Sequence, residues 1–175
     1  GIAAANVAVS ADAKKIAAFF ANAGIGADAL TLGAVHTDQD YSYSQDQNAP
    51  KRYVVREDVT VSSNDPKLIQ KLSQDITALT NQGVVLSVSD PQYYVSTLAA
   101  IRVSLVAKAV DDAKARAEQI AKSTGQSVGR LQSASTGVVQ VLAPNSTDVA
   151  DYGSYDTSTI DKRVSVTVRA TFFVN

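Results

Sequence analysis

Cysteine, methionine and tryptophan are all absent from this sequence of 175 residues, and histidine occurs once, as His36. Without a thiol the chain has no disulfide, no cysteine nucleophile and no thiolate metal ligand. A single imidazole also excludes a metal site built from two histidines of one chain. Packing alone must therefore stabilise the fold, and thiol catalysis is excluded.

A dominant charge and a long apolar run are missing too. Sixteen Lys and Arg residues nearly balance 17 Asp and Glu residues, so no positive field would attract nucleic acid. No run approaches the roughly 18 apolar residues that span a bilayer, so we expect a membrane link only through a segment upstream of Gly1. With 45% hydrophobic residues, residues 1–175 are typical of a single globular domain, and the composition fits an exported protein.

No motif for a reaction or a cofactor is present. The sequence lacks the nucleophile elbow G-x-S-x-G, the dinucleotide pattern G-x-G-x-x-G and the phosphate loop G-x-x-x-x-G-K-[ST]. Aspartates cluster without the spacing of a calcium loop, so a solvated surface is the simpler interpretation. They are Asp38, Asp40, Asp111, Asp112, Asp148, Asp151 and Asp156. We therefore predict no catalytic, cofactor-binding or metal-binding residue and no enzyme; a hydrolase acting through His36 is the third-ranked hypothesis.

Apolar periodicity predicts three helices. The first covers residues 4–23 and ends at Gly24, and the second starts at Pro66 after the N-cap sequence Asn64-Asp65 and ends at Gly83. The third, residues 98–124, is the longest and is closed by Gly125. Its apolar stripe consists of Leu98, Ile101, Leu105, Ala109, Ala113, Ala117 and Ile120. Alanines four residues apart, from Ala109 to Ala121, form a shallow ridge that favours close packing against a helix or a sheet.

Alternating apolar residues predict the strands. Residues 30–43 and 51–62 form a hairpin with a polar turn at residues 44–50, and residues 84–88 form a short strand. An irregular edge strand follows at residues 91–95. Residues 128–142 form a strand or a bent pair, and residues 163–174 form the clearest half-buried strand. The prediction is an α+β fold of three helices packed on a mostly antiparallel sheet, with a duplicated α/β unit suggested by three helix–glycine–strand segments.

Tyrosines gather near three predicted loops. They are Tyr41, Tyr43, Tyr93, Tyr94, Tyr152 and Tyr155. A rigid ring with a polar tip favours protein interfaces, although single tyrosines in strands often only pack on the sheet. The loop at residues 143–161 is long enough to suggest a function, such as a lid or platform for a small ligand or a cell-wall glycan.

Three segments together resemble the SIMPL domain family. They are AKAVDDAKARAEQIAKSTGQSVGRL at residues 107–131, GVVQVLAP at residues 137–144 and KRVSVTVRATFFV at residues 162–174. In that family an alanine-rich helix ends in glycine and leads into a V-G-x-L/V strand, and a closing strand follows a polar loop. The resemblance reaches back to Arg52 and Tyr53 and is strongest from Tyr93 to the end.

The resemblance implies an exported bacterial protein, periplasmic or outer-membrane-associated, with an α+β fold. Relatives assemble into large rings or tubes and are linked to envelope and oxidative-stress tolerance, without an agreed enzymatic activity or catalytic residues. Because members usually begin with a strand, the resemblance also implies an edge strand and an anchor upstream of Gly1. We expect a non-enzymatic domain that self-associates or binds envelope partners; the alternative is a module that binds a small ligand or glycan through residues 143–161.

Overall fold

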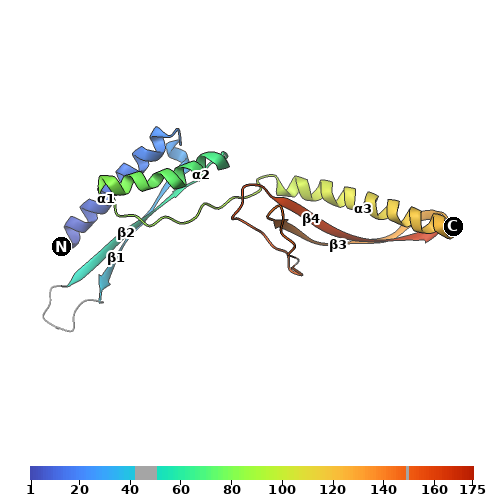
Figure 1. Cartoon of the computed structure of the whole chain (residues 1–175). Helices are drawn as coiled ribbons and strands as arrows, with labels where there is room; N and C mark the ends of the chain where they lie inside the picture. Colours follow the sequence, from blue (N-terminus) through green and yellow to red (C-terminus); the bar gives the residue numbers. More distant parts are fainter. Residues whose placement is uncertain (42–50, 149) are drawn as a thin grey trace. The chain divides into compact units, whose positions relative to one another are not determined.

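The computed structural model describes residues 1–41, 51–148 and 150–175. These residues form two compact units, Gly1–Pro91 and Gln92–Asn175, which are described separately below (Figure 1). They contain three α-helices and two antiparallel sheets of two strands each. The predicted α+β class, with three helices and antiparallel strand hairpins, is thus confirmed, and the described strands form two separate hairpins. The single domain over residues 1–175 stays a prediction.

The first unit contains α1 (Ile2–Asn22), β1 (Leu30–Asp40), β2 (Arg52–Val61) and α2 (Pro66–Asp75), with short 3-10 helices η1 (Ala27–Ala29) and η2 (Ile76–Gln82). Strands β1 and β2 pair antiparallel from Leu30 opposite Val61 to Asp40 opposite Arg52, with a register shift between Leu32 and Val35. The predicted hairpin is confirmed. Its predicted turn, and the end of its first strand at Tyr43, lie outside the described residues.

Local capping chemistry explains the second helix. The Asp65 carboxylate accepts hydrogen bonds from the backbone N–H groups of Lys67 and Leu68, both at 3.0 Å, and Pro66 occupies the first helical position. The chain then tightens into η2 and stops at Gly83, whose φ of 78° is left-handed. Both predicted ends of this helical segment are confirmed.

A small apolar core holds the first unit together. Phe20 of α1, Ile25 and Leu72 of α2 are buried against one another, and half-buried side chains from both helices surround them. Leu30 and Val61 join the same cluster from the end of the hairpin that lies away from its turn. The rings of Phe19 and Phe20 meet edge to face at 5.2 Å. Burial of this cluster positions α1 and α2 on the hairpin.

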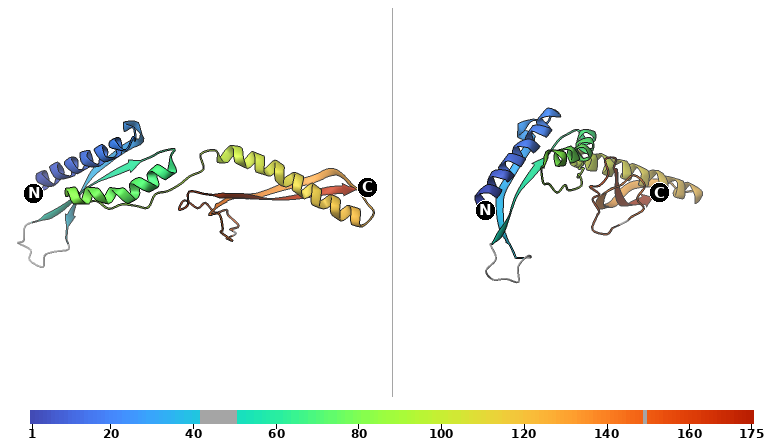
Figure 2. Two further views of the ribbon diagram at one scale, coloured as in Figure 1. Left: turned by 45° about the horizontal axis from the view of Figure 1, so that its top comes forward. Right: turned by 60° about the vertical axis from the view of Figure 1, so that its left-hand side comes forward.

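The second unit contains α3 (Leu98–Ser123), β3 (Val128–Leu142) and β4 (Arg163–Val174). β3 and β4 pair antiparallel, and the register shifts at three places along β3. Figure 2 shows α3 along one face of this hairpin. The predicted long helix and terminal strand are confirmed, and residues 128–142 form one irregular strand rather than two.

The alanine ridge of α3 packs within its own unit. Ala109, Ala113 and Ala117 are half-buried and Ala121 is buried, on a helix whose main neighbour is β4. Steps of four residues turn such a stripe by about 40° each, so it follows the twist of the hairpin. Ile120 was predicted in this stripe but is 69% exposed, because the contact face has rotated away from it by the time it reaches Ala121.

The two strands predicted between α2 and α3 are wrong. Residues 84–95 are extended but belong to neither sheet. The N–H of Tyr93 donates to the carbonyl of Thr157 at 2.8 Å and the N–H of Val95 donates to the Tyr155 hydroxyl at 2.7 Å, so residues 93–95 lie against a loop of the second unit. Among the described residues, a helix that ends at a left-handed glycine and is followed by a hairpin occurs twice, at Gly24 and at Gly125. Duplication of an α/β unit stays a prediction.

Candidate functional site

His36 lies in β1 without the partners of a hydrolase. It is exposed and sits opposite Arg56 in the hairpin register. The guanidinium of Arg56 donates instead to the carboxylate of Asp38 at 3.2 Å. No hydrogen bond joins the His36 side chain to a described hydroxyl or carboxylate, so the described residues form no Ser-His-Asp arrangement with it.

The acidic residues named in the sequence analysis lie mostly on solvated surfaces, with Asp156 as the exception. On α3, Asp112 pairs with Arg116 at 2.8 Å and Glu118 pairs with Lys114 at 3.8 Å, both one helical turn apart. In the loop after β3, Asp148 accepts a hydrogen bond from the Ser146 hydroxyl at 3.0 Å. Across residues 1–41, 51–148 and 150–175, no three His, Asp or Glu side chains gather where they could hold a metal ion.

The most organised polar cluster is one that the sequence analysis did not single out. In the loop before β4, the Asp156 carboxylate accepts hydrogen bonds from the N–H and hydroxyl of Ser158, at 3.1 and 2.6 Å, and from the N–H and hydroxyl of Thr159. The Lys162 ammonium lies 2.9 Å from the same carboxylate and donates to the backbone carbonyl of Asp156 at 2.6 Å. We call these four residues the Asp156 knot.

Burial and charge make the Asp156 knot a rigid element. The side chain of Lys162 is only 7% exposed and that of Asp156 is 21% exposed. Hydrogen bonds from Ser158, then Thr159, then Lys162 hold the pKa of Asp156 well below its usual range. The carboxylate therefore stays ionised, and a nearly buried ion pair fixes the loop where it enters β4.

The same contacts argue against a catalytic dyad. The Thr159 hydroxyl lies 3.5 Å from the Lys162 ammonium, the arrangement of a nucleophile and a lysine base. However, Thr159 also donates to Asp156, and Lys162 is paired with that carboxylate. Both the Thr159 hydroxyl and the Lys162 ammonium are thus already bound to the Asp156 carboxylate. The knot is suited to positioning the loop, not to nucleophilic attack.

Next to the knot, Tyr94 and Tyr155 form an exposed aromatic pair, here called the tyrosine pair. Their ring centroids are 6.0 Å apart with planes inclined at 44°, and they are 66% and 41% exposed. The Tyr155 hydroxyl accepts from the N–H of Val95, and the Tyr94 hydroxyl donates to the Gln92 side chain. Since both hydroxyls have partners within the unit, what the pair offers to a ligand is mainly ring surface.

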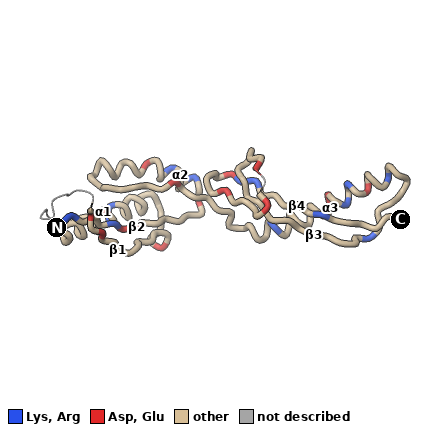
Figure 3. Tube along the Cα trace, turned by 90° about the horizontal axis from the view of Figure 1, so that it is seen from below, with Lys and Arg blue, Asp and Glu red and all other residues tan. Residues whose placement is uncertain are grey.

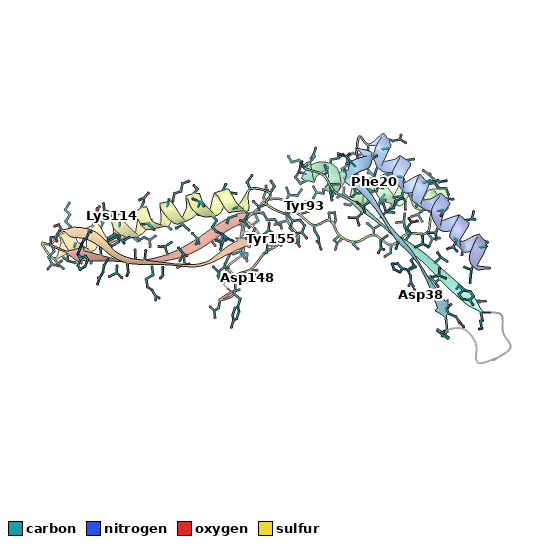
Figure 4. All side chains as sticks on the ribbon, turned by 180° about the vertical axis from the view of Figure 1, so that it is seen from behind. Phe20, Asp38, Tyr93, Lys114, Asp148 and Tyr155 are labelled. Carbon is teal, nitrogen blue, oxygen red and sulfur yellow. The ribbon has the colours of Figure 1, made fainter. Side chains whose placement is uncertain are left out.

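The backbone around Tyr155 is also fixed. The N–H of Val141 donates to the carbonyl of Ser154 at 2.8 Å, and the N–H of Asp156 donates to the carbonyl of Val141 at 2.7 Å. Val141 itself is 1% exposed. Figure 4 shows Tyr155 beside one end of the hairpin of β3 and β4, with Asp148 in the loop that extends from that end. Tyr152 is fully exposed and stands outside the pair, and predicted Tyr43 lies outside the described residues.

The surface has no charge of one dominant sign. Figure 3 shows Lys and Arg interspersed with Asp and Glu along both units. Large apolar side chains are exposed instead, including Val7 at 71%, Val85 at 94% and Val103 at 72%. Only nine described side chains are buried. None of the described helices is long and apolar enough to cross a membrane.

The family model for the SIMPL domain, described as a protein of unknown function (DUF541), matches residues 2–172. The match therefore covers nearly the whole sequence and both compact units. None of the curated proteins matches the chain.

Proposed function

Because the chain belongs to the SIMPL family, we propose that it is a non-enzymatic extracytoplasmic domain that self-associates in the cell envelope, contributing to envelope and oxidative-stress tolerance. The resemblance to exported relatives supports the location, as does the lack of cysteine. The mixed charges of the surface argue against nucleic acid as a partner. Self-association is the part of the proposal that the geometry supports best.

The observation that carries self-association is the accessible surface of 12,648 Å². A compact protein of 18.3 kDa would expose about 8,100 Å², and two unconnected compact bodies of half that mass would together expose about 9,800 Å². The surface exceeds both figures, the second of which assumes no contact between the two units. The excess is larger than the ~800 Å² that one partner buries in a standard interface.

The test is the solution mass, measured by light scattering behind a sizing column over a wide range of protein concentrations and at two salt levels. We expect a discrete mass that is a multiple of 18.3 kDa. Because association would bury exposed apolar side chains such as Val7, Val85 and Val103, high salt should not dissociate the assembly. A mass of one chain at every concentration would contradict the proposal.

The tyrosine pair favours a second candidate, a site for a cell-wall glycan. Exposed, rigidly held aromatic rings present flat apolar area at little entropic cost, and the apolar face of a sugar ring can stack on them. The Asp156 knot holds the loop that carries Tyr155, so the pair is ready before a ligand arrives. A soluble glycan-strand fragment is the appropriate probe.

Tyr94→Ala tests the glycan candidate, because the Tyr94 side chain bonds only to Gln92 whereas Tyr155 also anchors the backbone of Val95. We expect Tyr94→Ala to weaken binding of the fragment about tenfold, from ~1.4 kcal/mol of ring contact. Tyr94→Phe retains the ring and should bind like the parent protein in calorimetry. Equal binding by Tyr94→Ala, or none by the parent, would remove this candidate.

A further inference from the structure

Residues 84–89, here called segment 84–89, form an extended stretch without a partner strand. It follows Gly83 and is drawn in Figure 1 as a thin coil after α2. The N–H of Val84 bonds to the carbonyl of Leu79. From Val85 to Pro91, no backbone N–H or C=O bonds to another described residue. The segment thus carries a row of free donors and acceptors, which is what an unpaired strand presents.

The side chains at its start alternate as in a strand that lies on a core. Val84 is 1% exposed and Leu86 is half-buried, whereas Val85 between them is 94% exposed. Val88, two residues further along, is 47% exposed, so this alternation of burial covers residues 84–86. The composition, VVLSVS, has high β propensity and no charge. Asp90 and Pro91 then end the segment, because proline has no N–H to donate.

The four strands in the sheets are protected against edge pairing in ways that segment 84–89 is not. Register shifts interrupt β1 and β3, and such irregularities disrupt an edge. Charged side chains line β2 and β4, and charges are the other common protection. They are Arg52, Arg56, Glu57 and Asp58 in β2 and Arg163 and Arg169 in β4. Segment 84–89 combines free backbone groups with a composition that has no charge.

We propose that segment 84–89 is the self-association strand: the segments of two copies pair antiparallel across a two-fold axis. This inference rests on the self-association proposed above and names the surface that performs it. Each copy supplies the donors that the other accepts, so the surface is complementary to itself, as a two-fold interface requires. Antiparallel pairing also places the two Asp90 carboxylates at opposite ends, whereas parallel pairing would bring these like charges side by side.

Ser87→Pro tests the pairing. The N–H of Ser87 has no partner among the described residues, so its removal breaks no hydrogen bond within the chain, and an extended residue 86 tolerates a following proline. In a strand that is paired along the edge carrying the N–H groups of residues 85, 87 and 89, the same change removes a donor and places a ring against the neighbour. We expect Ser87→Pro to weaken association at least tenfold in concentration-dependent light scattering, while Ser87→Ala, which retains the N–H, assembles like the parent protein.

Hydrogen exchange of the parent protein provides an independent measurement. The amides of Val85, Ser87 and Ser89, which lie on the edge that Ser87→Pro tests, should be protected in the assembled protein and should lose that protection on dilution to single chains. The amides of α1 in Ser87→Pro should keep parent-like protection, which shows that the first unit is folded.

The outcomes separate the two proposals. A parent protein that is a single chain at every concentration would overturn both. Assembly with unprotected amides at Val85, Ser87 and Ser89, or with equal masses for Ser87→Pro and Ser87→Ala, would overturn strand pairing and leave self-association standing. Protection of these amides in single chains would show a partner within the chain and would also overturn the inference.

Discussion

Phe20→Ala is expected to lower the free energy of unfolding of the first unit by about 3–5 kcal/mol. Phe20 is 8% exposed and packs with Ile25 and Leu72 in the buried cluster, and its ring meets Phe19 edge to face. Truncation removes the largest side chain of that cluster and leaves a cavity. With so few buried residues in the unit, the remaining contacts have little capacity to offset the loss.

Hydrogen exchange resolved by residue is the measurement for Phe20→Ala, because it reports each unit separately. Amides of α1, α2 and the first hairpin should exchange faster, while those of β3 and β4 should keep their protection, since every member of the cluster belongs to the first unit. Val7→Ala is the matched control on the same helix: Val7 is 71% exposed, so a change within about 0.5 kcal/mol is expected. Equal loss of protection in both units would contradict the separate cores.

The helices could be predicted from the sequence because their signals are local. Asp65 and Pro66 begin α2 and Gly83 ends η2 through hydrogen bonds that span only a few residues. The face of α3 was predicted less well. Ile120 fits the periodicity of the helix, but its exposure depends on how a twisted hairpin passes beneath it, which no property of the helix alone determines.

Strand pairing was the least predictable feature, because a strand is defined by a partner that is distant in sequence. Segment 84–89 has the composition of a strand, yet none of the described residues pairs with it. The hairpin of β1 and β2 was recovered because one connection joins its two strands, whereas the pairing of β3 with β4 was not predicted. A sequence pattern shows that a segment can pair, and only the structure shows whether a partner lies within the chain.

The candidate site was anticipated in position but not in chemistry. The loop at residues 143–161 was expected to be functional through Tyr152 and Tyr155, whereas the structure pairs Tyr155 with Tyr94 and leaves Tyr152 without a ring partner. The Asp156 knot was missed. Its local part could have been found, because an aspartate followed by Ser and Thr two and three residues later commonly closes a turn. The burial of Lys162 could not have been predicted from the sequence, because it depends on how the loop packs against the rest of the unit.

The Asp156 knot predicts how the second unit responds to acid. The pKa of the Asp156 carboxyl lies well below the usual range in the folded protein, whereas in the unfolded chain this residue has the ordinary aspartate pKa of about 3.9. Below pH ~4 the unfolded state therefore binds a proton that the folded state does not, so stability falls as the pH falls. Above pH ~4 both states are ionised, and the full contribution of the knot is present.

Asp156→Asn isolates this contribution from that of the other carboxylates. The amide cannot balance the nearly buried Lys162 ammonium, so the variant should be less stable than the parent protein at pH 7. The difference should shrink progressively as the pH is lowered from 4 towards 2, because the parent protein loses what the variant never had. Urea unfolding at each pH, followed through the NMR signal of Val141, measures the free energy of unfolding of the parent protein and of the variant.

Asp148→Asn is the control in the same loop, because the Asp148 carboxylate accepts a hydrogen bond only from Ser146. The pH profile of its stability should parallel that of the parent protein. A deficit in Asp156→Asn that is as large at pH 2.5 as at pH 7 would show that the carboxylate contributes through shape and not through its charge.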